Sequence, residues 1–215
     1  MTLKNRSDRR TLRTCLLLAI VLSIFVRTVP VLAGSGEPGL PSFADFSHSV
    51  QNGEMDVLRG VYVPNVLALP VVQQPAGNPS HVSRRNGQAT QFSMAAEYDN
   101  VGLLAHNTLS GRFFSGLAIG QEVRLIYGSG KVEYFIVTEI LRYQALQPAS
   151  PYSDFRDLHG GGLISAGELF KRVYTGERHV TFQTCIEAEG NLSWGRLFIL
   201  AKPVTRYPRF GSPGR

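Results

Sequence analysis

The chain has 215 residues, 43% of them hydrophobic and 18% charged, enough for one domain with a buried core and short appendages. The formal net charge is +6, but residues 1–14 alone carry five basic residues against one aspartate. From Gly34 onward the chain has 16 basic and 15 acidic residues. Because the excess lies at the N-terminus, the charge gives no support for a nucleic-acid partner.

Residues 1–33 have the pattern of an export signal. The basic start precedes an apolar run over residues 15–26, which is too short to cross a hydrocarbon core of about 30 Å comfortably. Val31 and Ala33 fit the small-residue positions before a cleavage site. Two outcomes stay open, cleavage after Ala33 or retention as a membrane anchor. Both place the rest of the chain outside the cytoplasm, secreted or tethered to the outer face of the membrane.

Residues 34–56 form the next predicted segment, a linker followed by a short helix. Glycine and proline dominate its first part, and residues 42–53 place Phe43, Phe46 and Val50 on one helical face. Residues 57–205 form the predicted folded domain, and residues 206–215 a flexible basic tail.

The predicted domain is rich in short apolar runs typical of β-strands. Gly128-Ser129-Gly130 lies between two of them and predicts a hairpin, because glycine permits the positive φ of a tight turn. Residues 165–174 predict a helix that starts with a capping box of Ser165 and Glu168. About seven or eight strands, two or three short helices and no βαβ alternation predict a mainly β fold, a closed β-barrel.

Cys185 is the only cysteine outside the export segment, which contains Cys15. A single cysteine in an exported domain has no partner for an intramolecular disulfide. It is therefore an intermolecular bridge, an inert buried residue or a reactive thiol, and the cysteine alone does not decide between them.

Three strand segments carry residues that together suit acyl transfer. His106 follows the apolar run 101–105, Cys185 lies in the run 180–186, and Arg196 precedes the run 197–200, so that all three are expected at strand ends. A cysteine thiol is mostly protonated at neutral pH and needs a base such as an imidazole beside it. A guanidinium can donate hydrogen bonds to the oxyanion of the tetrahedral intermediate.

These motifs resemble the sortase family of cysteine transpeptidases. Thr181-Phe182-Gln183-Thr184-Cys185 is similar to the family's TLxTC strand, Gly195-Arg196 to its arginine strand, and Ala105-His106 to its GH motif. Phe182 and Ala105 depart from the family's leucine and glycine, as expected of a divergent member. The resemblance implies a sortase-like barrel with His106, Cys185 and Arg196 as catalytic residues. Ala105, Thr184 and Ile186 are the expected substrate-binding residues.

The resemblance also implies the reaction and its partners. Cys185 attacks a sorting motif of a secreted protein, and the thioacyl-enzyme is resolved by an amine of the cell envelope or of a pilin. No metal or organic cofactor is expected. Two alternatives stay open on the sequence: a noncatalytic extracellular β-barrel that binds peptide or envelope polymer, and a cysteine endopeptidase that uses water.

Overall fold

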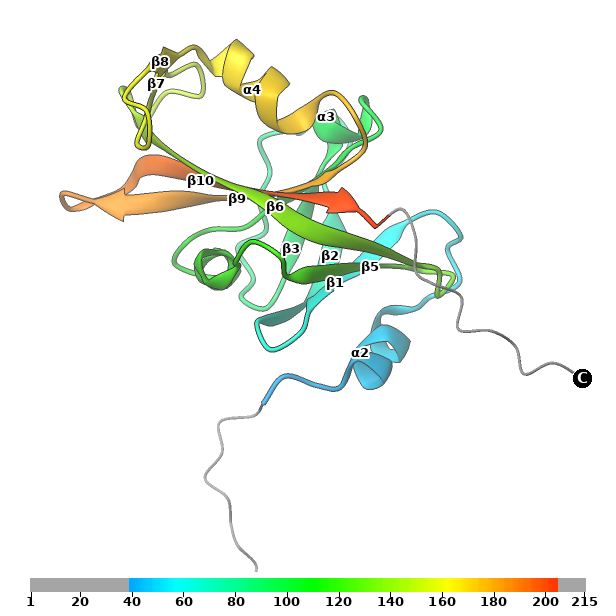
Figure 1. Cartoon of the computed structure of the whole chain (residues 1–215). Helices are drawn as coiled ribbons and strands as arrows, with labels where there is room; N and C mark the ends of the chain where they lie inside the picture. Colours follow the sequence, from blue (N-terminus) through cyan, green and yellow to red (C-terminus); the bar gives the residue numbers. More distant parts are fainter. Residues whose placement is uncertain (1–38, 205–215) are drawn as a thin grey trace, which may run out of the picture. The chain divides into compact units, whose positions relative to one another are not determined.

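The computed structural model describes residues 39–204 (Figure 1). The predicted export segment, the start of the linker and the predicted basic tail lie outside these residues. In the described part, no helix is long and apolar enough to cross a membrane.

Eight strands close into a β-barrel, which confirms the predicted mainly β fold. Their order is β10-β9-β4-β3-β2-β1-β5-β6, and pairing of β6 with β10 closes the sheet. Most neighbours are antiparallel, whereas β2 with β3 and β4 with β9 are parallel. The barrel strands are β1 (Leu58–Val63), β2 (Leu67–Gln73), β3 (Ala89–Phe92), β4 (Val101–Leu104), β5 (Glu122–Tyr127), β6 (Val132–Ala145), β9 (Val180–Ala188) and β10 (Asn191–Pro203).

The barrel core follows from the alternation of side chains along each strand. In β10, Leu197 and Ile199 belong to the core inside the barrel, whereas Phe198 and Leu200 pack in a second cluster. In β9, Phe182 is fully buried in the barrel core. Its neighbour Gln183 is only partly buried, so the face of β9 that carries Gln183 is the outer one.

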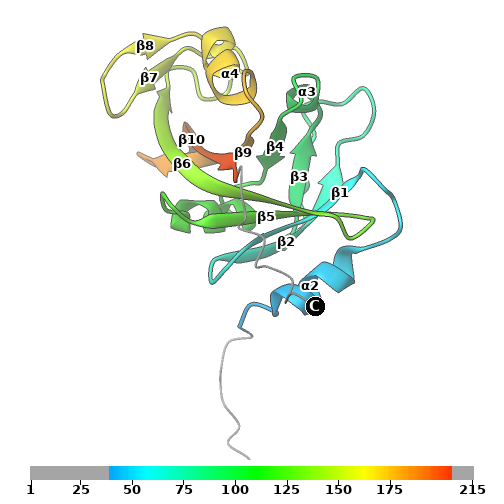
Figure 2. The same ribbon diagram turned by 45° about the vertical axis from the view of Figure 1, so that its right-hand side comes forward.

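The second apolar cluster covers the outer face of β6 and β10. Helix α4 (Ala166–Tyr174) contributes Leu169, Val173 and Tyr174, which pack with Phe198 of β10 and Tyr143 of β6. Figures 1 and 2 both show α4 lying over this face of the barrel. Strands β7 (Phe155–Asp157) and β8 (Leu163–Ile164) extend the sheet from β6 beside the helix.

The described part has four short helices, against the two or three expected. Helix α2 (Phe43–Val50) packs Phe46 against Tyr62, and α4 has the predicted capping box. The other two are α3 (Ser93–Ala96) and the 3₁₀ helix η1 (Ser110–Gly116). Both are too short for a helical period to show in the sequence, which explains the difference.

Candidate active site

The parallel pairing of β4 with β9 brings the backbone at His106 close to the backbone at Cys185. Leu104 is in register with Gln183, and the backbone N–H of Ala105 donates to the Gln183 carbonyl at 3.3 Å. His106 lies two residues beyond Leu104, as Cys185 lies two residues beyond Gln183. Neighbouring strands lie about 4.8 Å apart, so this register brings the histidine and the cysteine to adjacent positions.

Arg196 lies directly opposite Cys185 in the antiparallel pair of β9 and β10. Residues opposite each other in such a pair point to the same face of the sheet, with Cβ atoms about 5 Å apart. Two residues further along the strands, Gln183 pairs with Phe198 and points to the same face. Because those two residues lie on the outer face, Cys185 and Arg196 lie on it as well. Cys185 and Arg196 are both partly buried, which leaves them accessible to a substrate.

The expectation that all three residues lie at strand ends is wrong for two of them. Only His106 follows the end of its strand, whereas β9 continues to Ala188 and β10 already begins at Asn191. The two strands extend past the cysteine because a short turn at Glu189 and Gly190, both with positive φ, joins them into one long hairpin.

A β-bulge in this hairpin orients Arg196. The register shifts between Asn191 and Gly195, so that the residues between them are partly released from the ladder. Arg196 Nη1 donates to the carbonyls of Ser193 and Gly195, both at 2.9 Å. Its Nε and Nη2 groups make no hydrogen bond within residues 39–204. They therefore remain available to an oxyanion or a substrate carbonyl.

The same bulge holds the loop that carries the histidine. Asn107, the residue after His106, donates its side-chain amide to the carbonyl of Leu192 at 3.0 Å. The bulge thus contacts both the arginine and the histidine loop. One irregular segment of β10 fixes the relative positions of two of the three candidate catalytic residues.

Two of the three residues expected to bind substrate hold the start of the histidine loop. Ala105 and Thr184 are buried, and the Thr184 hydroxyl donates to the Ala105 carbonyl at 2.8 Å. Gly111 donates its N–H to the His106 carbonyl at 2.9 Å and lies against the Thr184 side chain. Ile186 is partly buried against the barrel core. Contact of Ala105, Thr184 and Ile186 with substrate stays a prediction.

Two cavities flank the strand that carries Cys185. The first, the α4 cavity, has a volume of about 400 Å³ and lies on the outer face below α4. Its lining is largely apolar and includes Leu104, Gln183, Arg196 and Phe198 of the sheet. The second, the rim cavity, has a volume of about 310 Å³ and includes Cys185 itself. The remaining rim residues are Asn107, Gly111, Arg112, Ser115, Arg142, Thr184, Ile186, Glu187 and Leu197.

Gln183 is held in a fixed orientation on the floor of the α4 cavity. The hydroxyl of Tyr174 donates to its side-chain carbonyl oxygen. Burial raises the pKa of Tyr174, so the hydroxyl keeps its proton and remains a donor. Gln183 lines the cavity, and its amide N–H groups make no hydrogen bond within residues 39–204, so they can donate to a peptide carbonyl.

Sequence patterns did not identify Asn107, Gly111 or the bulge as parts of the site. Asn107 has a weak signal, since it directly follows the candidate histidine. Gly111 has none, because its close contacts, the carbonyls of Ala105 and His106 and the side chain of Thr184 on β9, depend on how the loop and the strand meet. Within residues 39–204, no group of three or more His, Cys, Asp or Glu side chains is arranged to hold a metal ion.

Comparison with known proteins gives matches among solved structures only. No family model matches the chain, and no curated protein matches its sequence. The chain is similar to sortase C1 from Streptococcus suis, with 13% identity and a TM-score of 0.48 over 78% of this chain and 83% of that one. It is also similar to sortase C1 from Streptococcus agalactiae, with 18% identity and a TM-score of 0.45 over 96% and 91%. It is similar as well to sortase A from Listeria monocytogenes, with 14% identity and a TM-score of 0.43 over 70% of this chain and 89% of that one.

Proposed function

We propose that this chain is a sortase-like cysteine transpeptidase with Cys185 as nucleophile. The observation that carries the proposal is the register of three strands. It sets Arg196 opposite Cys185 on one face of β9 and β10, and it directs the chain that continues to His106 toward the position of the cysteine. An inert buried cysteine needs neither neighbour, whereas acyl transfer needs a proton carrier and an oxyanion donor at this spacing.

In the first half-reaction, the Cys185 thiolate attacks the carbonyl carbon of a peptide bond in the α4 cavity. The free Nε and Nη2 groups of Arg196 donate hydrogen bonds to the oxyanion that forms. Protonated His106 then gives its proton to the leaving amine nitrogen, and the C–N bond breaks. A thioacyl-enzyme with a neutral imidazole remains.

In the second half-reaction, a neutral amine attacks the thioacyl carbon. His106 accepts the proton that the amine loses, the C–S bond breaks, and Cys185 leaves as a thiolate. The starting protonation state is thereby restored. The proposed substrates are a secreted protein with a C-terminal sorting signal and an amine of the cell envelope or a pilin. The proposed site of action is outside the cytoplasm, with the enzyme secreted or tethered to the outer face of the cytoplasmic membrane.

The test is formation of the thioacyl-enzyme. The purified full chain is incubated with an LPxTG-type peptide, quenched in weak acid and analysed by intact-protein mass spectrometry. We expect a covalent adduct on the wild type, none on Cys185→Ala, and diversion of the adduct to a ligated product when an amine is added. His106→Ala should lose nearly as much activity as Cys185→Ala, because the two act as one unit.

Arg196→Lys separates the oxyanion role from simple charge. An ammonium can contact the bulge carbonyls but does not reproduce the planar fork that leaves two groups free. We expect a loss of at least about a hundredfold in the first half-reaction. Full activity of Cys185→Ala, or failure of a thiol probe to label Cys185 in the folded protein, would favour the binding-module alternative. An adduct resolved only by water at every amine concentration would favour the endopeptidase.

A further inference from the structure

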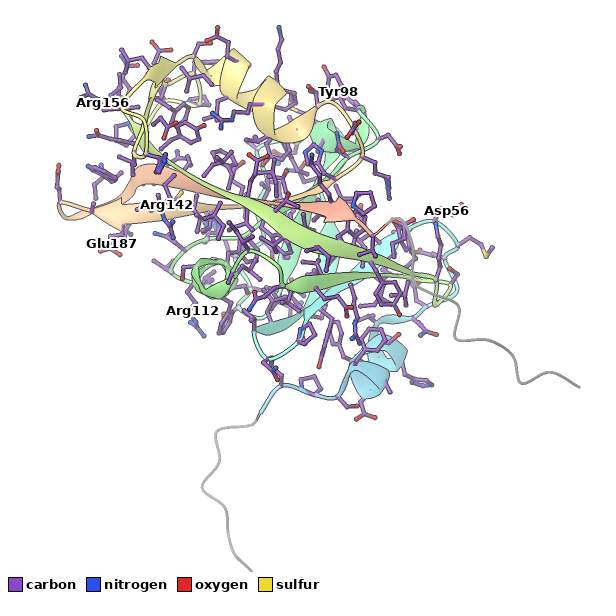
Figure 3. The ribbon with its side chains drawn as sticks, viewed as in Figure 1. Asp56, Tyr98, Arg112, Arg142, Arg156 and Glu187 are labelled. Carbon is purple, nitrogen blue, oxygen red and sulfur yellow. The ribbon has the colours of Figure 1, made fainter. Side chains whose placement is uncertain are left out.

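The rim cavity next to Cys185 carries charged groups that the two half-reactions above do not use. Arg112 comes from η1, Arg142 from β6 and Glu187 from β9, so three separate elements converge on one cavity. Figure 3 shows the three labelled side chains on the same side of the molecule, far from Asp56 and Tyr98.

The two arginines have no acidic partner within residues 39–204. The Arg112 guanidinium lies over the ring of Phe113, 4.7 Å from its centre, which orients it without neutralising it. Arg142 makes no side-chain hydrogen bond or ion pair in the described part of the chain. Glu187 forms no ion pair there either. The cavity therefore has two unpaired guanidinium groups and one unpaired carboxylate.

We infer that the rim cavity binds the acceptor amine, and that this acceptor also carries an anionic group, a carboxylate or a phosphate. Guanidinium groups recognise both anions through charge-assisted hydrogen bonds. Glu187, two residues beyond Cys185 on the same strand, attracts the positive end of the acceptor toward the thiol. This inference rests on the proposed transpeptidation.

The position of the cavity fits the second substrate. The acyl group held in the α4 cavity occupies the Arg196 side of the cysteine, so an incoming amine needs another approach. The rim cavity is lined by Cys185 itself and lies beside the residues that follow His106. An amine nitrogen entering there reaches the thioacyl carbon and can pass its proton to His106, as the second half-reaction requires.

The experiment isolates the second half-reaction from recognition of a sorting motif. A small N-acetylglycine thioester acylates Cys185 by thiol exchange, in which the Cys185 thiolate displaces the small thiol. The acyl-enzyme is then offered matched pairs of amines at one pH. Glycylglycine is compared with glycylglycinamide, and O-phosphoethanolamine with ethanolamine. Mass spectrometry gives the ratio of ligated to hydrolysed product for each amine, so different amounts of acyl-enzyme cancel.

We expect the wild type to favour an anionic acceptor over its neutral partner by at least about fivefold, and the stronger of the two preferences identifies carboxylate or phosphate. Arg112→Gln and Arg142→Gln should each reduce that preference by about fivefold or abolish it. Arg156→Gln is the matched control, because Arg156 is an exposed arginine of β7 outside both cavities and should retain the preference.

The outcomes separate the inference from the function on which it rests. If the wild type forms no acyl-enzyme, or Cys185→Ala acylates equally well, the proposed transpeptidase fails. If acylation succeeds but neither anionic acceptor is preferred, the inference is overturned and the function stands. The inference is also overturned, and the function stands, if Arg112→Gln and Arg142→Gln prefer the anionic acceptor as strongly as Arg156→Gln does.

Discussion

Replacing Gly111 by alanine tests whether close backbone contact holds the loop that carries His106. A Cβ atom at position 111 would lie 2.6 Å from the Ala105 carbonyl oxygen and 2.7 Å from that of His106, and would also clash with Thr184 Oγ1. Two of these three atoms belong to the backbone, so no side-chain rotation relieves the clash. We expect overpacking to cost about 1–3 kcal/mol and loss of the Thr184–Ala105 hydrogen bond about 1 kcal/mol more.

The expected total of about 2–4 kcal/mol corresponds to a fall in Tm of roughly 5–15 °C for a domain of this size. Thermal unfolding followed by circular dichroism measures it. Gly116→Ala is the control in the same 3₁₀ helix, since a Cβ there meets only Val66 Cγ1 at 3.6 Å. It should remain within about 1 kcal/mol of the wild type. Equal melting temperatures for the two variants would refute the reasoning.

Two further predictions concern stability. Thr184→Val should lower the free energy of unfolding by about 1–3 kcal/mol, because the buried Ala105 carbonyl loses its hydrogen-bond donor. Thr184→Ser keeps the hydroxyl and should retain most of the stability; unfolding in urea measures both. Burial opposes ionisation of Glu133, but hydrogen bonds from Lys131, Arg178 and Tyr127 outweigh it and lower the pKa of Glu133. That stabilisation is present above the unfolded-state value of about 4.3 and is lost as the pH falls through the lower folded value. The Tm difference between wild type and Glu133→Gln should therefore be largest near pH 7 and shrink in acid; a constant difference would contradict this.

The sequence was sufficient for features that depend on local chemistry. Glycines 128 and 130 predicted the hairpin of β5 and β6, and the pairing of these strands shows it. Ser165 and Glu168 predicted the start of α4, where both capping hydrogen bonds form. Strand number and the lack of βαβ alternation predicted the closed barrel. The hairpin and capping signals lie within a few residues of the structures that they specify, whereas the barrel follows from a pattern over the whole domain.

The rest of the site depends on how distant segments meet. The bulge between Asn191 and Gly195 has only a weak sequence signal, the glycine itself, because Leu192, Ser193 and Trp194 would suit a regular strand. The bulge exists only relative to the register of β9. The role of Asn107 likewise arises from its contact with Leu192, 85 residues further along the chain. Gly111 has a comparable long-range contact with Thr184 on β9.

The parallel pairing of β4 with β9 also bears on when the thiol becomes active. Thr184 and Ala105 meet across 79 residues, and such high-contact-order pairings form late because the intervening chain must first lose its freedom. Until they form, the chain segment that carries His106 is not held beside the strand of Cys185. In a chain that is exported before it folds, the proposed nucleophile would therefore stay latent in transit. Completion of the barrel is thus the step that assembles the proposed site.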